Sequence, residues 1–375
     1  METAEDDDAM KLFSEVARYV IPLIFGVIAV LGFVGNLLVI VVVVANKQMR
    51  STTNILIISL ALADLLFIVV CVPFTAVGFV VPSWPFGRLF CKLYGYVIFV
   101  TAHASVYTLV LMSLDRYLAV VHPIRSMTIR SERNAYLAIG LTWLVIGSAN
   151  SPIFIEYDLI DLPDYEDCVV CQIADYEDHG RVFYGCFFSF GFAIPLTIVS
   201  ILYGTMIHKL LYGGMPRPNN GIAGTKASEG MRVKRRVTKM VVVVVLIFAV
   251  CWLPLQVIFL VTSFGNYPDT IEGIIVKLAF NCLAYMNSCV NPILYAFLSD
   301  NFRKSFRKVL GCASGTGFQA LKADAERTRD FEKTRDTAGG RLRDMDRARD
   351  ITQPNAIDGG QDEATCSYHN CDTSL

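Results

Sequence analysis

The sequence predicts an all-α protein: a bundle of seven membrane-spanning helices, then an amphipathic cytoplasmic helix and a disordered C-terminal tail. Hydrophobic residues make up 54% of the 375-residue chain, and its mean hydropathy is +0.48. Such a chain is too apolar for an ordinary soluble protein of this size. Seven of its stretches are long enough and sufficiently free of charge to cross a bilayer, for which a helix needs about 20 apolar residues.

The seven stretches define the expected spans. They cover residues 19–45, 52–80, 91–121, 134–155, 182–207, 237–264 and 271–298. Residues 1–18 are polar and lack the apolar core of a cleavable signal peptide, so the first span would serve as its own insertion signal. Prolines inside the spans, among them Pro195, Pro254 and Pro292, would kink the helices and mark candidate hinges.

Charged residues distinguish two kinds of loop. The loop between the fifth and sixth spans carries basic residues from Lys209 to Lys239 against the single acid Glu229, and the loops after the first, third and seventh spans are also basic. The loop after the fourth span is acidic from Glu156 to Asp178. Because basic loops stay in the cytoplasm, we expect an extracellular N-terminus, a cytoplasmic C-terminus and a multi-pass membrane protein.

Ionisable side chains inside the spans are functional candidates. Asp64 lies within the second span, and Asp115 and Arg116 stand together at the end of the uncharged run of the third. A charge in hydrocarbon is costly unless it faces protein or water, so such residues usually mark a functional site. The alternative for Arg116 is a flanking charge that marks the cytoplasmic border.

The chain after the seventh span is polar apart from one amphipathic segment. Residues 300–311 place Phe302 and Phe306 on one helical face with bases on the other, which predicts a helix on the cytoplasmic leaflet. Cys312 is a candidate for palmitoylation, the alternative being a free thiol. Residues 313–375 form the tail, whose end, Thr-Ser-Leu, could add a strand to a PDZ groove.

The cysteines do not predict a metal centre. Cys168 and Cys171 form one Cys-x-x-Cys pair in the loop after the fourth span, but no second pair accompanies it. We expect neither enzymatic activity, because no nucleophile–base arrangement is visible, nor a nucleic acid partner.

Motifs distributed over the spans together resemble a known family. The motifs are Gly35-Asn36, Leu60 to Asp64, Cys91, Asp115-Arg116-Tyr117, Trp143, Pro195, Cys251-Trp252-x-Pro254 and Asn291-Pro292-x-x-Tyr295. In order and spacing, residues 19–312 resemble the rhodopsin-like G protein-coupled receptors. Within that family the chain is similar to the insect A-type (FGL-amide) allatostatin receptors, relatives of the galanin receptors, in residues 50–54, 71–75, 84–87, 101–108, 237–245, 283–285 and 288–303.

The resemblance implies a plasma-membrane receptor for an extracellular amidated neuropeptide, first of all an A-type allatostatin. Agonist binding outside would open helix six inside and activate a heterotrimeric G protein of the inhibitory class; arrestin and receptor kinases would be further partners. One alternative is a receptor for a galanin-, somatostatin- or opioid-like peptide, because a fold does not fix its ligand. The other is a transporter, which would need inverted repeats and broken midplane helices that the sequence does not show.

The resemblance also implies a ligand cavity in the outer half of the bundle. The side chains facing it would be Ile98, Phe99, His103, Gln256, Phe259, Lys277, Asn281 and Tyr285. Ile98 stands where amine receptors carry an aspartate, and Tyr285 where opsins carry the retinal lysine, so an aminergic receptor and a photoreceptor are not expected. The acidic loop over the cavity would steer cationic ligands towards it.

A disulfide and a sodium site follow from the same resemblance, and no other cofactor is expected. Cys91 would pair with Cys168 or Cys171, and similarity to the galanin receptors favours Cys171. The sodium pocket would consist of Asp64, Ser105, Asn287, Ser288 and Asn291. The alternatives for Asp64 are a purely structural polar network and a protonated carboxyl group.

The last implied set is the activation switch of such a receptor. It comprises Asp115, Arg116, Tyr117, Pro195, Tyr203, Phe248, Trp252, Pro254, Pro292 and Tyr295, with Val106 packed near Pro195 and Phe248. Residues 232–239, before the sixth span, contain no acid to pair with Arg116, which departs from the ionic lock of the family. We therefore expect Asp115 and Thr238 to hold Arg116.

Overall fold

The computed structural model of the protein describes residues 4–46, 49–81, 83–161, 168–174, 179–212, 222–265, 267–268, 270–299 and 302–307. Within these ranges, seven helical stretches are long and apolar enough to cross a membrane: Lys11–Ala45, Thr52–Val80, Gly87–Val121, Glu132–Glu156, His179–Lys209, Val241–Phe264 and Ile271–Phe297. The predicted seven-helix bundle is therefore confirmed.

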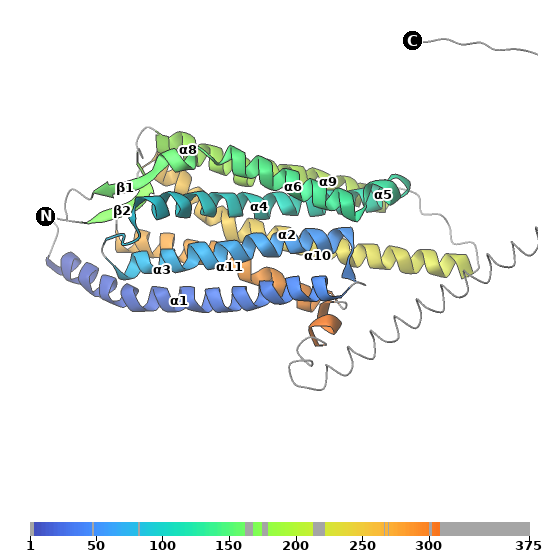
Figure 1. Ribbon diagram of the computed structural model, residues 1–375, viewed down its shortest axis with the longest axis horizontal. Helices are drawn as coiled ribbons and strands as arrows, with labels where there is room; N and C mark the ends of the chain where they lie inside the picture. The colour runs from blue at the N-terminus through green and yellow to red at the C-terminus, as the bar shows by residue number, and fades with distance from the viewer. Residues whose placement is uncertain are drawn as a thin grey trace, which may run out of the picture. The chain divides into compact units, whose positions relative to one another are not determined.

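The spans lie side by side along one direction (Figure 1). The first is α1 (Ala4–Ala45); the second is α2 (Thr52–Leu66), the π-helical segment η2 (Phe67–Cys71) and α3 (Val72–Val80); the third is α4 (Gly87–Val121). The fourth is α6 (Glu132–Ala149) with α7 (Ile153–Glu156), and the fifth is α8 (His179–Phe188), the π-helical segment η3 (Ser189–Ala193) and α9 (Ile194–Tyr212). The sixth and seventh are α10 (Ile222–Phe264) and α11 (Ile271–Leu298), and the short α5 (Pro123–Ile129) joins α4 to α6.

A two-stranded hairpin, absent from the all-α prediction, lies at one end of the bundle. Strands β1 (Tyr157–Asp161) and β2 (Val169–Ile173) pair antiparallel, with Leu159 opposite Cys171. An isolated hairpin is marginal in water, but the Cys91–Cys171 disulfide ties this one to α4. Figure 1 shows the hairpin at the end of the bundle where α1 begins, and α5 at the opposite end; we call these the hairpin end and the α5 end.

Both π-helical segments precede a proline by two residues. Segment η2 ends at Cys71, before Pro73, and η3 ends at Ala193, before Pro195. Proline offers no backbone N–H to the preceding turn, and local π-helical adjustment lets the freed carbonyls find other partners. The hinge predicted at Pro195 is thus a widened turn inside a continuous helix.

Helices α1 and α10 begin earlier than the spans predicted from hydropathy. Helix α1 starts at Ala4 rather than at residue 19, and α10 starts at Ile222 rather than at residue 237. Once a helix exists, each added residue gains a backbone hydrogen bond without a new nucleation step. Polar flanks can therefore extend a membrane helix beyond its apolar stretch.

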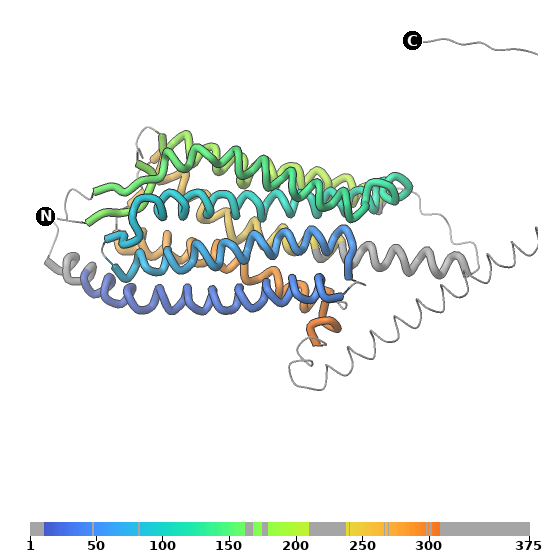
Figure 2. The backbone as a smooth tube through the Cα atoms, in the orientation of Figure 1, coloured from blue at the N-terminus to red at the C-terminus, as the bar shows by residue number. Residues whose placement is uncertain are grey.

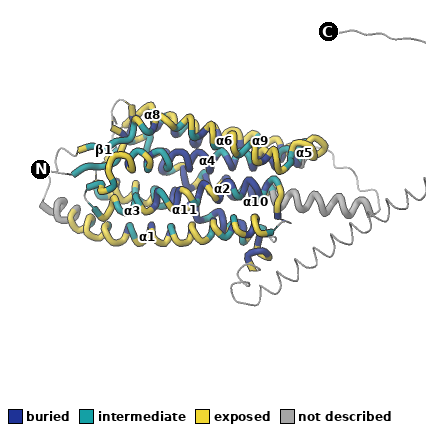
Figure 3. The backbone as a smooth tube through the Cα atoms, in the orientation of Figure 1, coloured by how far each residue is buried: buried dark blue, intermediate teal, exposed yellow. Residues whose placement is uncertain are grey.

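Helix α4 is central to the bundle. It packs against α2, α6, α9 and α10, while α1 packs against α2, α3 and α11. Buried residues gather where the helices face one another, and exposed residues follow their outer sides (Figure 3). Many of the exposed side chains are large and apolar, such as Leu23 and Leu144, which are 69% and 67% exposed. In a bilayer these side chains would contact lipid.

A short helical segment follows α11 at the α5 end (Figure 2). Residues 302–307 are helical, Phe302 and Phe306 are buried, and Arg303 is exposed. Phe302 stacks on Tyr295 of α11, with 5.5 Å between the ring centroids. This arrangement fits the amphipathic helix expected at residues 300–311, whose remaining residues, like Cys312 and the tail, lie outside the described residues.

Candidate functional site

The carboxylate of Asp64 is the centre of a polar cluster in the middle of the bundle. The Ser105 hydroxyl of α4 donates to its Oδ1 at 3.3 Å, and Asn291 Nδ2 of α11 donates to its Oδ2 at 2.8 Å. Ser288 interacts with the same carboxyl, and Asn287 is buried beside Ser288 in sequence. The structure thus brings three of the other four predicted sodium-pocket residues, Ser105, Ser288 and Asn291, into contact with the Asp64 carboxylate.

Helix α1 is joined to this cluster through Asn36. Its amide donates to the Ser288 carbonyl at 2.8 Å and to the Gly32 carbonyl at 2.9 Å. A Cβ atom added to Gly35 would lie 3.0 Å from the Pro292 Cβ atom, so α1 and α11 approach closely here. The Gly35-Asn36 motif therefore allows the contact and supplies its hydrogen bonds.

The chemistry of this cluster fits a small hard cation. It offers one carboxylate with hydroxyl and amide oxygens nearby, the kind of donors such cations prefer. Asn291 turns its Nδ2, rather than its oxygen, towards Asp64 in this structure. Among the described residues, no group of three or more His, Cys, Asp or Glu side chains could hold a transition metal.

A second polar cluster lies at the α5 end, around Asp115. Its Oδ2 accepts a hydrogen bond from Thr53 of α2 at 2.8 Å and one from Arg116 Nε at 3.0 Å. Its Oδ1 lies 2.6 Å from Arg130 Nε, next to α5. Arg116 also contacts the Thr53 hydroxyl. The buried Asp115 carboxylate therefore balances the charges of two arginines and accepts a hydrogen bond from one hydroxyl. These partners come from three different segments of the chain.

The expected partners of Arg116 are only partly correct. Asp115 holds it as predicted, but the described contacts of Arg116 include Thr53 and not Thr238. Neither Thr53 nor Arg130 was among the predicted site residues. Arg130 was visible in the sequence only as one base of a basic loop, because its contact depends on how α5 folds back.

Aromatic side chains near Trp252 join α10 to α8 and η3. The centroid of the Trp252 ring lies 6.0 Å from that of Phe248 on its own helix and 6.2 Å from that of Phe187 of α8. Phe248 in turn stacks with Phe192 of η3 at 6.4 Å. Trp252 Nε1 and the Tyr295 hydroxyl, both buried, have no hydrogen-bond partner among the described residues. Buried donors without a protein partner are uncommon, which makes these two side chains noteworthy positions on α10 and α11.

The predicted ligand residues separate into two groups. Three of them surround Phe187. The ring centroids of Phe99, His103 and Phe259 lie 4.8, 5.6 and 6.3 Å from that of Phe187, and Phe99 meets it edge to face. Tyr285 lies elsewhere: its hydroxyl is 3.1 Å from the Thr75 hydroxyl. The Thr75 hydroxyl is also 2.8 Å from the hydroxyl of Tyr94, which was not among the predicted site residues.

The other four predicted ligand residues differ in burial. Gln256 is fully buried, and its Oε1 has no partner among the described residues. Ile98 is partly buried against the core. Lys277 is exposed, and the Asn281 amide donates to the Lys277 carbonyl at 2.9 Å, so that amide is engaged by its own helix.

Ion pairs fix the hairpin to the start of α4. Asp158 of β1 lies 2.8 Å from Arg88 and 3.4 Å from Lys92. The backbone N–H of Leu159, which donates to Asp158 at 2.8 Å, together with these bases, holds the pKa of this carboxyl below its usual value. Together with the disulfide, these contacts hold the hairpin over the end of the bundle.

A sequence model of the seven-transmembrane receptors (rhodopsin family) matches residues 35–295. The chain belongs to the rhodopsin family of seven-transmembrane receptors. The allatostatin-A receptor of Bombyx mori is 49% identical over 307 residues, which cover 80% of this chain and 82% of that protein. Galanin receptor 2a of Danio rerio is 39% identical over 300 residues, 80% of each chain, and the galanin-like G-protein coupled receptor npr-9 of Caenorhabditis elegans is 39% identical over 332 residues, 81% of this chain and 76% of that protein.

These similarities confirm the family that the motifs indicated. The receptor is a multi-pass membrane protein, and its relatives are receptors rather than enzymes, which confirms that prediction as well. The disulfide pairs Cys91 with Cys171 and leaves Cys168 as a free thiol, so the favoured alternative is correct. The two polar clusters and the aromatic residues near Trp252 are the candidate machinery of the receptor.

Proposed function

We propose that this receptor binds an amidated neuropeptide of the A-type allatostatin class and activates a heterotrimeric G protein. The observation that carries the proposal is the 49% identity to a receptor named for allatostatin-A over four-fifths of the chain. The galanin receptors share less of the sequence. A galanin-like peptide is therefore the second candidate.

The proposed orientation places the hairpin end outside the cell. The Cys91–Cys171 disulfide supports it, because structural disulfides persist in oxidising compartments. The basic loops predicted to be cytoplasmic support it as well. The peptide would then enter between the hairpin and the side chains near Gln256, Phe259 and Tyr285, and the G protein would bind at the α5 end.

In the proposed mechanism, the agonist shifts an equilibrium between two arrangements of the bundle. Phe259 lies near Phe187, which touches Trp252, so a ligand at the hairpin end can act on α10 through these rings. Movement of α10 would change the surroundings of Arg116, which Asp115 and Thr53 hold in this structure. Released from them, Arg116 would be free to contact a G protein.

The proposal includes a sodium ion at Asp64. Asp64, Ser105, Ser288 and Asn291 would hold it, with Asn291 turning its oxygen inwards. The ion would compensate the buried carboxylate and favour the arrangement in which these helices stay close. Palmitoylation of Cys312 and binding of arrestin, kinases or a PDZ protein concern residues outside those described and stay predictions.

Equilibrium binding tests the ligand assignment. Membranes from cells expressing the receptor would be incubated with a labelled FGL-amide peptide and competed with the unlabelled peptide, its free-acid form, galanin, somatostatin and an opioid peptide. We expect saturable binding that the amidated FGL peptide displaces at far lower concentration than any other competitor. Displacement by galanin at equal or lower concentration would replace the allatostatin assignment with the second candidate.

A further inference from the structure

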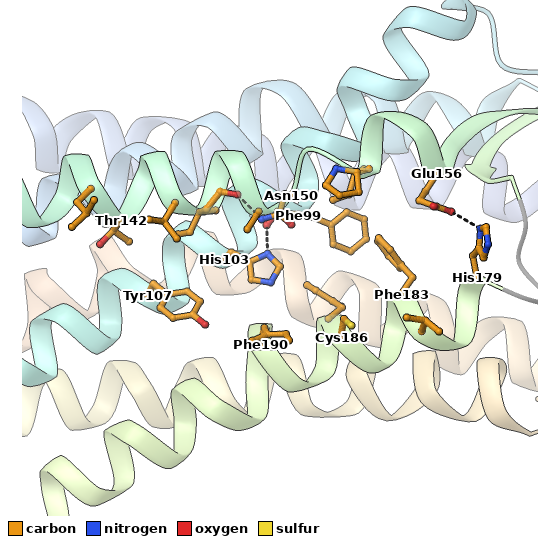
Figure 4. A pocket seen from close by; sticks show the side chains of 18 residues that line it. Phe99, His103, Tyr107, Thr142, Asn150, Glu156, His179, Phe183, Cys186 and Phe190 are labelled. Carbon is orange, nitrogen blue, oxygen red and sulfur yellow. Dashed lines mark hydrogen bonds and ion pairs between the residues drawn. The ribbon is translucent and has the colours of Figure 1, made fainter.

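A cavity of about 900 Å³ opens on the side of the bundle, between α4, α6–α7 and α8–η3 (Figure 4). This volume lies within the range of pockets that hold small molecules. Most of its lining is apolar, and its outer edge includes Leu141, Val145, Val182 and Phe190, which are between 54% and 68% exposed. Because this edge belongs to membrane-spanning helices, the cavity opens towards the hydrocarbon of the bilayer.

One polar side chain in the cavity is buried and incompletely paired. His103 of α4 is 9% exposed, and its Nδ1 lies 2.7 Å from the Phe99 carbonyl. A carbonyl only accepts, and a charged ring would be costly at this depth, so the proton of the neutral ring is on Nδ1. Nε2 is then an acceptor with no partner among the described residues, and Figure 4 shows the ring within the cavity.

The rest of the lining gives no site for a charged ligand. The Glu156 carboxylate and His179 Nδ1 lie 3.2 Å apart at the hairpin end of the cavity, so the acid is already engaged. The Asn150 amide donates to the Ile146 carbonyl of its own helix at 2.8 Å. The interior therefore suits an apolar molecule that presents one hydrogen-bond donor to His103.

The inner wall of the cavity adjoins the proposed switch. Phe99 and Phe187 line it, and Phe187 contacts Trp252 edge to face at 6.2 Å. An occupant that fixes Phe187 therefore restricts the space into which the Trp252 ring can move. This link does not pass through Tyr285, which lies on the other side of the bundle near Phe67 and Phe25.

We propose that this cavity is a second binding site, for a neutral hydroxylated lipid that enters from the membrane. Its apolar body would lie against α6 and α8, and its hydroxyl would donate to His103 Nε2. A sterol and a monoacylglycerol both carry this chemistry. Occupancy would change the response to the peptide through Phe187 and Trp252, and only this last clause rests on the proposed function.

Photolabelling of the purified full-length receptor in nanodiscs tests the site without any peptide. The probe is a cholesterol analogue with a photoreactive group, competed with cholesterol, with cholestene, which lacks the hydroxyl, and with monooleoylglycerol. We expect saturable labelling within residues 141–156 or 182–190 that cholesterol or monooleoylglycerol reduces and cholestene does not. Competition by only one of the two would identify the lipid class.

Two pairs of variants sharpen the experiment. His103→Leu should weaken binding of the hydroxylated competitor roughly three- to tenfold, as expected for the loss of one hydrogen bond. His103→Gln keeps an acceptor and should weaken its binding less. Val145→Trp should fill the cavity and abolish labelling, whereas Leu144→Trp, on the neighbouring lipid-facing position, should not. The proposal is wrong if wild-type labelling of these segments does not saturate, if cholestene competes equally, or if the two tryptophan variants label alike.

Discussion

At the scale of single residues, Asp115 is the shared partner of the polar side chains at the α5 end of the bundle. It is 4% exposed and is shared by Thr53, Arg116 and Arg130. A buried carboxylate of this kind is tolerated because its partners compensate its charge, and removing it leaves a buried base without a counter-charge. Arg116, which is 7% exposed, is the base most affected.

The substitution Asp115→Asn should raise basal signalling. The amide keeps the size of the carboxylate but loses its charge, so Arg116 is less strongly held in the arrangement seen here. We expect basal nucleotide exchange to rise severalfold per receptor at the cell surface, measured in membranes without agonist. Ser126→Ala, a neutral change on nearby α5, serves as the control. Basal exchange equal to that of the wild type, with normal surface expression, would contradict the role of the pair.

Asp64 gives a second prediction at the residue scale. If sodium binds there, Na⁺ should lower the affinity of the peptide agonist, and Asp64→Asn should remove this dependence because the carboxylate is the only charged donor of the cluster. Agonist competition would be measured in NaCl and in choline chloride of equal ionic strength. A wild-type-like sodium effect in Asp64→Asn would exclude this carboxylate as the ion's ligand.

At the scale of secondary structure, the hairpin is the element most dependent on its attachments. The disulfide to Cys91 and the ion pairs of Asp158 with Arg88 and Lys92 all join it to α4. Loss of a native disulfide typically costs about 2–5 kcal/mol, whereas an exposed ion pair contributes about 0–1 kcal/mol. The disulfide should therefore dominate the attachment.

The two cysteines of the Cys-x-x-Cys pair test this ranking. Cys171→Ser should strongly reduce surface expression and peptide binding, because it frees the hairpin from α4. Cys168→Ser should change neither, since Cys168 is a free thiol. Surface labelling of both variants in parallel measures the effect. A larger loss in Cys168→Ser would mean that the pairing in the folded receptor is the other one.

The ion pairs of Asp158 allow a prediction with a defined pH dependence. Folding lowers the pKa of this carboxyl, so the ionised Asp158 stabilises the folded state. This stabilisation is complete above the ordinary aspartate pKa of about 3.9 and is lost only at lower pH. Asp158→Asn should therefore lower the Tm of the purified receptor by at most about 2–4 °C, equally at pH 5.5 and pH 8. Asp161→Asn is the matched control. A loss present at pH 8 and absent at pH 5.5 would contradict the assigned pKa direction.

At the scale of the whole molecule, hydropathy and charge were sufficient to predict the seven spans, because bilayer thickness sets a minimum length for each apolar stretch. They did not predict the hairpin, because its two five-residue strands show only weak alternation of apolar and polar residues. The π-helical turns before Pro73 and Pro195 were visible only as prolines, since the backbone response to a proline depends on its neighbours. The full lengths of α1 and α10 were not predicted, because their first residues are polar and hydropathy detects only the apolar part of a helix.

The candidate site shows the same division. Ser105, Ser288 and Asn291 lie around Asp64, as the motif positions suggested, because those positions fix the inward face of each helix. Phe99 and His103 line the lateral cavity, whereas Tyr285 lies apart from it, with its hydroxyl 3.1 Å from the Thr75 hydroxyl. Successive helical residues point about 100° apart, so small rotations of α4 decide which cavity a side chain lines. No single sequence specifies that rotation.

The proposed receptor responds to an FGL-amide peptide at the hairpin end by activating a G protein at the α5 end. The most direct measurement is nucleotide exchange on a purified heterotrimeric G protein of the inhibitory class, with the receptor reconstituted in nanodiscs. We expect the amidated FGL peptide to accelerate exchange strongly, its free-acid form and galanin to act far more weakly, and Arg116→Ala to remove the response while peptide binding persists. Specific peptide binding with no acceleration on any G protein class, or acceleration by galanin alone, would contradict the proposed function.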